Sequence, residues 1–381
     1  MIQKLSVPKR LEQKLRSLPP WIFRTDLDHS LSYGELVLLV DGKNKGLAFG
    51  LADSGDISIR VLGRSPRQIR TILEQRIQQA HNLRTRFGPR ETNCFRLLNG
   101  EGDGLSGIIA DVYDSTIVLR LYSKCWLPYL DTIVSILAKL PAIDRIYRKF
   151  GVRNVDGRKG GVTLFGGELP DQILVKEHGI IFLVRPKKGQ KTGLFLDQRE
   201  HRKIIGSMSK DKLVSNLFAY NGGFSIYAAM GGAKRVYSVD IAAQALEDAK
   251  EIFRLNGINP DKHVFEATDA FKWRSPEPMD IFICDPPSLS KGKHSDSNAQ
   301  KAYQDLATSC AKQVAKGNIL ATASCTARLT NKEWERSIIN GVRSHGQWSW
   351  LWRSYEPLDH PTMLEHFEAR YLKFALLHRR Q

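Results

Sequence analysis

The spacing of apolar and polar positions divides the chain into three parts. In the first part, short apolar runs alternate with polar turns such as Asp41-Gly42, which predicts a small β-barrel over residues 31–63. These runs fall at 37–40, 47–51 and 57–62. Over residues 66–87 the apolar side chains recur near a 3.6-residue period instead, and Gly88-Pro89 follows. This second pattern predicts a helix that ends at Gly88.

The central part, from about residue 90 to residue 185, mixes strand patterns with one helix, predicted over 128–139. It begins near the glycine-rich segment Asn99-Gly-Glu-Gly-Asp-Gly104. No strand is predicted directly before this segment, and its two acidic side chains would repel phosphate. The pattern therefore favours a tight connection over a phosphate-binding loop. The strands of this part are predicted at 107–111, 117–121, 143–147 and 180–184.

From Pro186 onward, strand patterns alternate with helix patterns. This alternation predicts an α/β domain whose parallel sheet carries helices on both faces. The strands are predicted at 212–217, 235–239, 263–266, 280–284 and 318–323, and the helices at 223–230, 242–255 and 298–315. Two later segments, 348–352 and 371–377, are predicted to close the sheet as an antiparallel pair.

Composition adds a statement about partners and compartment. The 57 Lys and Arg residues exceed the 40 Asp and Glu residues, which gives a net charge of +17 and favours nucleic acid as partner. A merely soluble basic protein is the alternative. The five cysteines are scattered, without a Cys-x-x-Cys pair, which indicates a reducing compartment and excludes a zinc ribbon. We expect no metal site. No signal peptide and no apolar run of ~20 residues is found, so we expect a cytoplasmic protein without a membrane span.

The segment Leu213–Ser225 is predicted as a buried strand, an Asn-Gly-Gly turn and the start of a helix. In open α/β sheets, ligands bind at the carboxyl ends of such strands. Asp240, at the end of the next strand, suits the hydroxyl groups of a ribose. The turn lacks the Gly-x-Gly-x-x-Gly pattern of a pyrophosphate site, so a nucleoside without phosphates, usually S-adenosylmethionine, is indicated. A solvated strand-end carboxylate is the alternative for Asp240.

Three further residues follow predicted strands at the same edge of the sheet. Asp269 could accept from an adenine amino group, or cap a helix that begins there. Asp285, in Cys284-Asp-Pro-Pro287, ends a strand where a planar base could stack and hydrogen-bond, although a purely structural break would use the same residues. Cys325 follows the strand at 318–323. Its thiolate would be a nucleophile toward carbon, and inert packing is the alternative.

Taken together, these segments resemble the motifs of class I S-adenosylmethionine-dependent methyltransferases. More closely, they resemble the RlmI-like family of large-ribosomal-subunit RNA cytosine-5 methyltransferases, which carry an N-terminal PUA domain. The resemblance covers the whole chain. The motifs that carry it are Lys191-Thr-Gly-Leu-Phe-Leu-Asp-Gln-Arg199, Asn216-Leu-Phe-Ala-Tyr-Asn-Gly-Gly-Phe-Ser225, Ser238-Val-Asp240, Cys284-Asp-Pro-Pro-Ser288, Ala323-Ser-Cys325, Pro20-Trp-Ile-Phe23, Gly34-Glu-Leu-Val37, Arg60-Val-Leu62, Arg96-Leu-Leu-Asn-Gly-Glu-Gly-Asp-Gly-Leu105, His360-Pro361 and Glu368-Ala-Arg-Tyr-Leu-Lys373.

The resemblance implies a Rossmann-like methyltransferase domain with a mostly parallel seven-stranded sheet. It also implies roles for individual residues: Cys325 as nucleophile and Asp285 as the residue that holds the cytosine edge. The cofactor-binding residues would be Gly193, Asp197, Gln198, Arg199, Phe218, Ala219, Tyr220, Gly222, Gly223, Asp240, Ile241, Asp269, Ala270 and Asp285. The substrate-binding residues would be Pro286, Pro287 and Ser288. Ser288 stands where other families of RNA cytosine-5 methyltransferases carry a second cysteine.

The resemblance also implies three domains: a PUA-like RNA-binding barrel over residues 1–78, a central α+β domain over 79–187 and the methyltransferase domain over 188–381. The expected activity is S-adenosylmethionine-dependent methylation of C5 of a cytosine in 23S ribosomal RNA, which yields 5-methylcytosine. A homodimer is expected by analogy. Two alternatives stay open: methylation of a nitrogen on another ribosomal RNA base with Cys325 passive, and a non-catalytic RNA-binding factor in ribosome assembly.

Overall fold

The computed structural model describes residues 2–289, 295–364, 366 and 370–380 of the chain. Contacts divide the chain into two compact units, and each unit is built from several separate stretches of sequence. Unit 1 contains Met1–Glu177, Val184–Leu196 and Leu358–Ala369. Unit 2 contains His178–Leu183, Asp197–Pro357 and Arg370–Gln381. The sequence pattern gave no indication that Leu358–Ala369 would pack with the N-terminal half of the chain.

The N-terminal part of unit 1 is a five-stranded sheet in the order β1-β3-β4-β5-β2. Its strands are β1 (Gln3–Ser6), β2 (Trp21–Phe23), β3 (Leu36–Val40), β4 (Gly46–Ala52) and β5 (Ile57–Gly63), with α1 (Lys9–Lys14) and η1 (Leu15–Ser17) between β1 and β2. Alternate residues of β3 and β5 point into a core shared with α1, in which Leu11, Val37 and Ile59 are buried. The three predicted strands of this region are confirmed.

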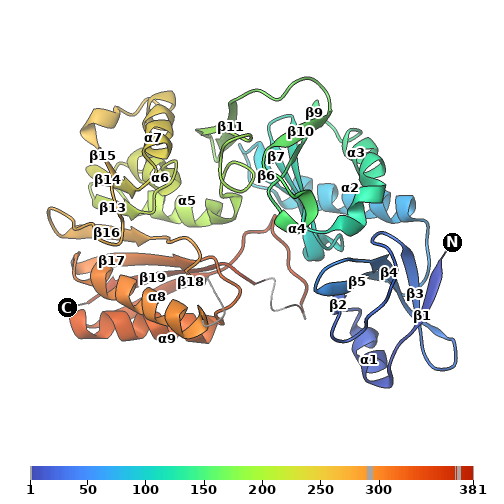
Figure 1. Cartoon of the computed structure of the whole chain (residues 1–381). Coiled ribbons are helices and arrows are strands. Elements are labelled where there is room, and N and C mark those ends of the chain that lie inside the picture. Colours follow the sequence, from blue (N-terminus) through green and yellow to red (C-terminus); the bar gives the residue numbers. More distant parts are fainter. Residues whose placement is uncertain (1, 290–294, 365, 367–369, 381) are drawn as a thin grey trace. The chain divides into compact units, whose positions relative to one another are not determined.

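The central part of unit 1 is a second five-stranded sheet, in the order β10-β9-β8-β7-β6, with two helices packed against its apolar side (Figure 1). The strands are β6 (Cys94–Asn99), β7 (Ile108–Tyr113), β8 (Thr116–Leu121), β9 (Arg145–Lys149) and β10 (Gly161–Phe165). The helices are α2 (Ile69–Phe87) and α3 (Leu130–Leu137), with short α4 (Arg153–Asp156) and the 3-10 turn η3 (Lys124–Tyr129). A separate two-stranded sheet follows, β11 (Ile173–Glu177) with β12 (Ile180–Val184).

The glycine-rich segment forms a docking site, called the seat below, for residues 359–361. β6 ends at Asn99, directly before the segment, so the prediction that no strand precedes it is wrong. Residues Gly100–Asp103 form the 3-10 turn η2. A Cβ atom on Gly102 would overlap the carbonyl group of Pro361, which explains the glycine. Asn99 Nδ2 donates to that carbonyl oxygen at 2.9 Å, and Arg84 pairs with Asp103 at 2.5 Å.

Two backbone contacts to Asp359 complete this seat within unit 1. Arg84 Nη2 donates to the carbonyl oxygen of Asp359 at 2.9 Å, and the backbone N–H of Arg96 donates to its carboxylate at 3.0 Å. His360, fully buried, bonds through Nδ1 to the same carboxylate at 3.0 Å. The His360-Pro361 motif is therefore a docking element of unit 1. Glu368 and Ala369, in the last motif quoted above, lie outside the described residues.

Unit 2 is a seven-stranded sheet in the order β15-β14-β13-β16-β17-β19-β18. The strands are β13 (Leu213–Leu217), β14 (Arg235–Asp240), β15 (Val264–Ala267), β16 (Met279–Cys284), β17 (Val314–Ser324), β18 (Trp348–Ser354) and β19 (Lys373–Arg379). The first five run parallel, and β19 pairs antiparallel with both β17 and β18. The predicted α/β sheet and its antiparallel closing pair are confirmed.

Helices cover both faces of this sheet (Figure 1). α5 (Arg199–Ser207), α6 (Gly223–Met230) and α7 (Ala243–Leu255) lie on one side, and α8 (Ser295–Ala311) with α9 (Asn331–Val342) on the other. Short 3-10 turns η4 (Leu196–Gln198), η5 (Pro260–Lys262) and η6 (Arg343–His345) complete the unit. The predicted helices near 223–230, 242–255 and 298–315 are confirmed, whereas α5 and α9 were not predicted.

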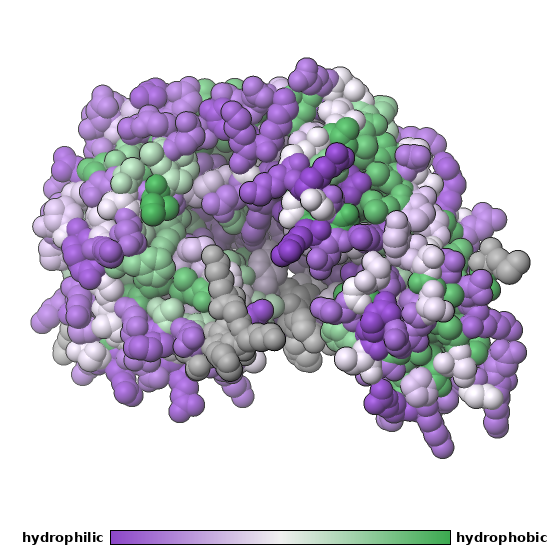
Figure 2. Space-filling view, in the orientation of Figure 1, coloured by the Kyte–Doolittle hydropathy of each residue, from purple (hydrophilic) through white to green (hydrophobic). Residues whose placement is uncertain are grey.

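The surface drawn in Figure 2 is mostly hydrophilic, in agreement with the many charged residues of the chain. Figure 2 shows hydrophilic side chains over most of the face drawn, with apolar side chains gathered in smaller patches. Among the helices of the described residues, none is both long enough and apolar enough to cross a membrane.

Candidate active site

The candidate residues of unit 2 follow the carboxyl ends of four neighbouring parallel strands. The turn 218–223 follows β13, Asp240 ends β14, Asp285 follows β16 and Cys325 follows β17. The order β14-β13-β16-β17 and the parallel registers bring these four ends to one edge of the sheet. The prediction that the parallel topology gathers these residues is confirmed.

The turn after β13 is held in an unusual backbone conformation. Phe218 and Tyr220 adopt positive φ angles of 60° and 50°, which costs non-glycine residues roughly 1–2 kcal/mol each. Gly222, also left-handed at φ 74°, precedes α6, and a Cβ on it would come within 2.8 Å of the Ala249 Cβ. The turn is therefore fixed by tight packing.

A buried network of hydrogen bonds joins the strand before the turn to the helix after it. Asn216 Nδ2 donates to Ser225 Oγ at 2.9 Å, and Ser238 Oγ donates to the same oxygen at 2.7 Å. These three side chains, at most 1% exposed, join β13, β14 and α6. Because buried polar groups are costly unless they are hydrogen-bonded, the network specifies one arrangement of these elements.

Asp240 organises the loop around the strand end. Its Oδ2 accepts from the backbone N–H of Tyr220 at 2.8 Å, and its Oδ1 accepts from that of Ala242 at 2.9 Å. A half-buried carboxylate with these two bonds is not simply solvated, and each oxygen keeps a lone pair for a ribose hydroxyl. The neighbouring Ile241 is 79% exposed, which is unusual for an isoleucine.

Asp269 lies in a turn after β15, and no helix begins there, so the helix-cap alternative is wrong. Its Oδ1 accepts from the backbone N–H of Phe271 at 3.0 Å. Phe271 is 46% exposed and meets Phe218 edge-on with ring centroids 5.1 Å apart, while Ala270 is buried.

The residues at this edge fit an adenine nucleoside. The exposed apolar side chains of Ile241 and Phe271 offer faces on which a planar base could pack. The carboxylate of Asp240 offers acceptors for ribose hydroxyls, and that of Asp269 for an exocyclic amine. The fit is to a neutral or cationic group, because two carboxylates would repel a phosphate.

Asp285 is oriented by an uncharged relay. Gln198 Nε2 donates to Asp285 Oδ2 at 3.0 Å, and Gln198 Oε1 lies 2.5 Å from His201 Nδ1. Since the amide donates to the carboxylate, its oxygen must accept, so His201 Nδ1 carries the proton. Burial lowers the pKa of His201 to about 3, so its ring is neutral near pH 7. It stacks on Phe374 at 4.2 Å.

The signature 191–199 is anchored at its two ends by different units. In unit 1, Thr192 Oγ1 donates to Asp111 at 2.6 Å and lies 2.9 Å from the Tyr113 hydroxyl, and the Gly193 N–H donates to Gln190 at 2.9 Å. In unit 2, Asp197 accepts from the Tyr371 hydroxyl at 2.6 Å. The guanidinium of Arg199 is buried, with Nε 3.3 Å from Glu200.

The three residues after Asp285 differ in exposure. Pro286 is buried, Pro287 is exposed and Ser288 is half-buried, in a stretch without regular structure. Pro287 and Ser288 are thus the members of this group with solvent-accessible surface.

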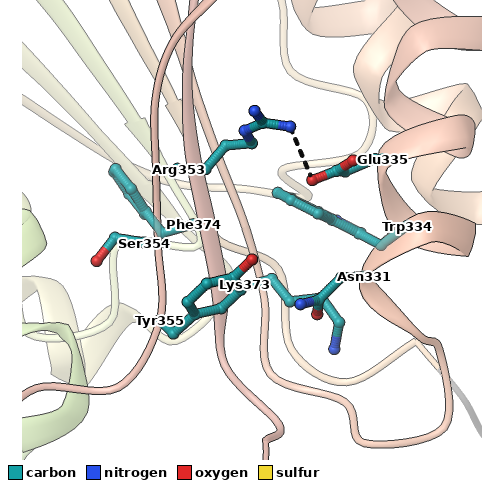
Figure 3. Close-up of a pocket in the computed structure, with 8 residues that line it drawn as sticks. All are labelled: Asn331, Trp334, Glu335, Arg353, Ser354, Tyr355, Lys373 and Phe374. Carbon is teal, nitrogen blue, oxygen red and sulfur yellow. Dashed lines mark hydrogen bonds and ion pairs between the residues drawn. The ribbon is translucent and has the colours of Figure 1, made fainter.

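Cys325 is half-buried and stands among polar groups from three elements. The hydroxyl of Ser324 donates to that of Tyr303 on α8 at 2.9 Å, and burial raises the pKa of Tyr303 above its usual range. Lys373 on β19 donates through Nζ to the carbonyl oxygen of Thr326 at 2.7 Å. Lys373 also lines a small pocket between α9 and strands β18 and β19, beside the Arg353–Glu335 ion pair of 3.3 Å (Figure 3).

The sequence interpretation missed three residues of this region: His201, Tyr303 and Lys373. His201 lies in α5, whose buried face is largely charged, so no apolar pattern marked it. Lys373 is the last residue of the motif at 368–373, which supports the family resemblance. Nothing in the sequence indicated that its ammonium group would be buried.

Comparisons with known proteins agree with this geometry. Residues 156–328 match a family model described as S-adenosylmethionine-dependent methyltransferase, and residues 5–64 match a PUA-like domain. A ribosomal RNA large subunit methyltransferase of Deinococcus radiodurans is 34% identical, with 98% of this chain and 97% of the relative covered. A ribosomal RNA large subunit methyltransferase I of Cronobacter sakazakii is 31% identical, with coverage of 99% and 100%. The chain belongs to the ribosomal RNA large subunit methyltransferase I family.

Solved structures place this family member on a known fold. A candidate methyltransferase complexed with SAH is 25% identical, with a TM-score of 0.88 and coverage of 98% of this chain and 99% of that chain. A candidate SAM-dependent methyltransferase from Streptococcus mutans gives a TM-score of 0.86 at 25% identity, with the same coverage. As a member of an S-adenosylmethionine-dependent family, the protein takes that compound as its methyl donor, which agrees with the nucleoside fit at Asp240.

Proposed function

We propose that the protein methylates C5 of a cytosine in 23S ribosomal RNA through a covalent bond between Cys325 and the base. One observation carries the proposal: Cys325 and Asp285 follow adjacent parallel strands, at the edge that also holds Asp240 and the turn 218–223. A thiol and a carboxylate thus lie at the edge of the sheet where we propose that the nucleoside binds. The relatives named above are large-subunit RNA methyltransferases, which supports ribosomal RNA as the substrate.

The reaction needs the thiol because C5 of cytosine is a weak nucleophile. Attack of the Cys325 thiolate on C6 forms a C6–Sγ bond and moves electron density to C5. C5 would then take the methyl group that bound S-adenosylmethionine would supply, as the methyl–sulfur bond of the donor breaks and leaves its electron pair on sulfur. A base removes the C5 proton, and the electron pair left on C5 re-forms the C5–C6 double bond. The C6–Sγ bond breaks, and its electrons return to sulfur.

The chain's own residues orient the two reactants. Asp285, fixed by Gln198 and His201, would accept a hydrogen bond from the exocyclic amine of the cytosine. The target base must leave its stack to reach this edge, so partly unfolded RNA is favoured over duplex. Pro286, Pro287 and Ser288 would line its path.

We propose the following residues for the cofactor. Asp240 would bind the ribose, Asp269 the adenine amine, and Ile241, Ala270 and Phe271 the faces of the adenine ring. The methionine part would lie along the turn after β13. The remaining members of the set are Gly193, Asp197, Gln198, Arg199, Phe218, Ala219, Tyr220, Gly222, Gly223 and Asp285.

The test is the Cys325→Ala variant, assayed with unmodified 23S RNA from a strain that lacks the gene. We expect loss of methyl transfer and unchanged binding of S-adenosylmethionine by calorimetry. Cys94→Ala, a buried cysteine of unit 1, is the matched control for removal of a thiol. Full activity of the Cys325→Ala variant would refute the nucleophile.

Mass analysis of the product separates the alternatives. A 5-methylcytosine product supports the proposal, and a base methylated on nitrogen replaces it with an N-methyltransferase. If the wild-type protein binds no S-adenosylmethionine, a non-catalytic assembly factor is favoured instead. We further propose a division into domains 1–78, 79–187 and 188–381 and a cytoplasmic location. We also propose a homodimer, which analytical ultracentrifugation by sedimentation would test.

A further inference from the structure

Lys373 is a buried cation that the proposed mechanism has not yet used. It is the first residue of β19, and the antiparallel register places it directly opposite Ser324, the residue before Cys325. Its side chain is part of the core, with an exposure of 1%. Figure 3 shows it reaching from β19 toward Asn331 at the start of α9. Lysine is almost never fully buried unless it is paired, so this position calls for a reason.

The ammonium group of Lys373 contacts the main chain next to Cys325. Its Nζ donates to the carbonyl oxygen of Thr326 at 2.7 Å and lies 3.4 Å from that of Tyr371. The lysine is thus opposite the residue before Cys325 and bonded to the residue after it. Within the described part of the chain, no carboxylate oxygen lies within 4.0 Å of Nζ in an ion pair.

The nearby carboxylates are committed to backbone groups. Glu356 Oε1 accepts from the N–H of Leu372 at 2.9 Å, and Glu333 caps α9 by accepting from Thr330 at 2.8 Å. Burial lowers the pKa of Lys373, while Glu356, Cys325 and Glu333 act in the opposite direction. Cys325 is therefore within electrostatic range of the ammonium.

Two other titratable side chains share this region, and neither supplies positive charge. Tyr303 is held neutral by burial, and its hydroxyl bonds Ser324. Asp285 lies, like Cys325, within electrostatic range of Tyr303, and its carboxylate would disfavour a second negative charge. Lys373 is a positively charged group near Cys325 that would favour one.

We propose that Lys373 is the positioning residue that stabilises the thiolate of Cys325, an inference that rests on the proposed nucleophilic role of this cysteine. The thiol proton passes to water as the thiolate forms, and the ammonium keeps its own protons. When the C6–Sγ bond later breaks, its electron pair returns to a sulfur beside the same positive charge. Lysine thus assists both attack and release without touching the substrate.

A purely structural role makes a different prediction. If Lys373 only tethers the Thr326 carbonyl, any donor of similar length would serve, with or without charge. Lys373→Gln keeps an N–H donor and removes the charge, whereas Lys373→Arg keeps both. The rate at which iodoacetamide alkylates Cys325, followed by peptide mass spectrometry against pH, reports the thiolate and not the tether.

We expect the alkylation midpoint of the wild-type protein to lie below the ordinary cysteine value of about 8.5. Lys373→Gln should raise this midpoint by about 1–2 pH units, which slows alkylation at pH 7 by about ten- to a hundredfold. Lys373→Arg should stay within a few tenths of a unit of the wild type. Lys250→Met, at an exposed ion pair with Glu247, is the control for loss of a surface charge.

Two outcomes would overturn the inference. One is a Lys373→Gln midpoint equal to that of the wild type, in protein whose circular dichroism and S-adenosylmethionine binding are unchanged. The other is a wild-type midpoint at or above about 8.5, which needs no variant and decides the matter even if the glutamine variant fails to fold. Because alkylation requires no methyl transfer, failure of the proposed function would appear separately, as full activity of Cys325→Ala.

Discussion

Replacing Gly102 with alanine tests whether residues 358–364 are held by the glycine-rich segment. The added methyl group would overlap the carbonyl of Pro361, and both groups are main-chain or rigidly attached to it, so the docked segment must move. Three hydrogen bonds depend on its position, at 2.9, 2.9 and 3.0 Å, from Asn99, Arg84 and Arg96. At about 1 kcal/mol for each bond, the loss is about 3 kcal/mol.

An opposing effect reduces this figure. Alanine restricts the unfolded chain more than glycine does, which stabilises the folded state by roughly 0.4–1 kcal/mol. A net loss of about 2 kcal/mol should lower the melting temperature by roughly 4–8 °C. Gly42→Ala measures the opposing effect alone, because a Cβ on Gly42 meets nothing within 4 Å.

The assay is thermal unfolding followed by circular dichroism, combined with hydrogen exchange of peptides that span 358–364. We expect faster exchange in this segment for Gly102→Ala and wild-type exchange for Gly42→Ala. If both variants melt together and exchange alike, the segment does not depend on this seat.

Two further predictions concern the relay behind Asp285. Gln198→Leu removes the hydrogen-bond donor to the carboxylate of Asp285. Because a hydrogen bond to a charged group is worth roughly 1.5–3 kcal/mol, the rate of methyl incorporation should fall by about ten- to a hundredfold. An unchanged rate would exclude the relay. Because the pKa of His201 is about 3 in the folded protein, the unfolded chain takes up a proton below pH 6.5 that the folded protein does not. Its contribution to stability therefore falls as the pH drops from 6.5 toward 3. In urea titrations, the difference in unfolding free energy between wild type and His201→Asn should shrink over this range, and a constant difference would contradict the assignment.

The edge of the sheet was predictable from sequence because each of its residues ends an apolar run. Asp240, Asp285 and Cys325 follow buried strands, and parallel pairing then fixes that their positions share one edge. The strand ends are local features, so periodicity finds them.

The supporting residues were not predictable in the same way. The buried face of α5 includes Arg199, His201 and Arg202. Because these side chains are polar or charged, their spacing in the sequence is typical of a solvent-exposed face. Lys373 begins an otherwise apolar strand, and its burial depends on partners at Thr326 and Tyr371. The docking of Pro361 on Gly102 joins residues more than 250 positions apart. Hydrophobic spacing carries no information on such pairings.

The interleaving of the two units also sets an order of events during synthesis. Unit 1 includes residues 358–369, which the ribosome adds only after residues 197–357 of unit 2. Until then, Arg84 and Asn99 lack the carbonyl groups of Asp359 and Pro361 to which they donate in the finished protein. The strand that carries Lys373 is made later still. Unit 1 therefore cannot complete these contacts until most of unit 2 has been made, so the two units cannot fold strictly one after the other during synthesis.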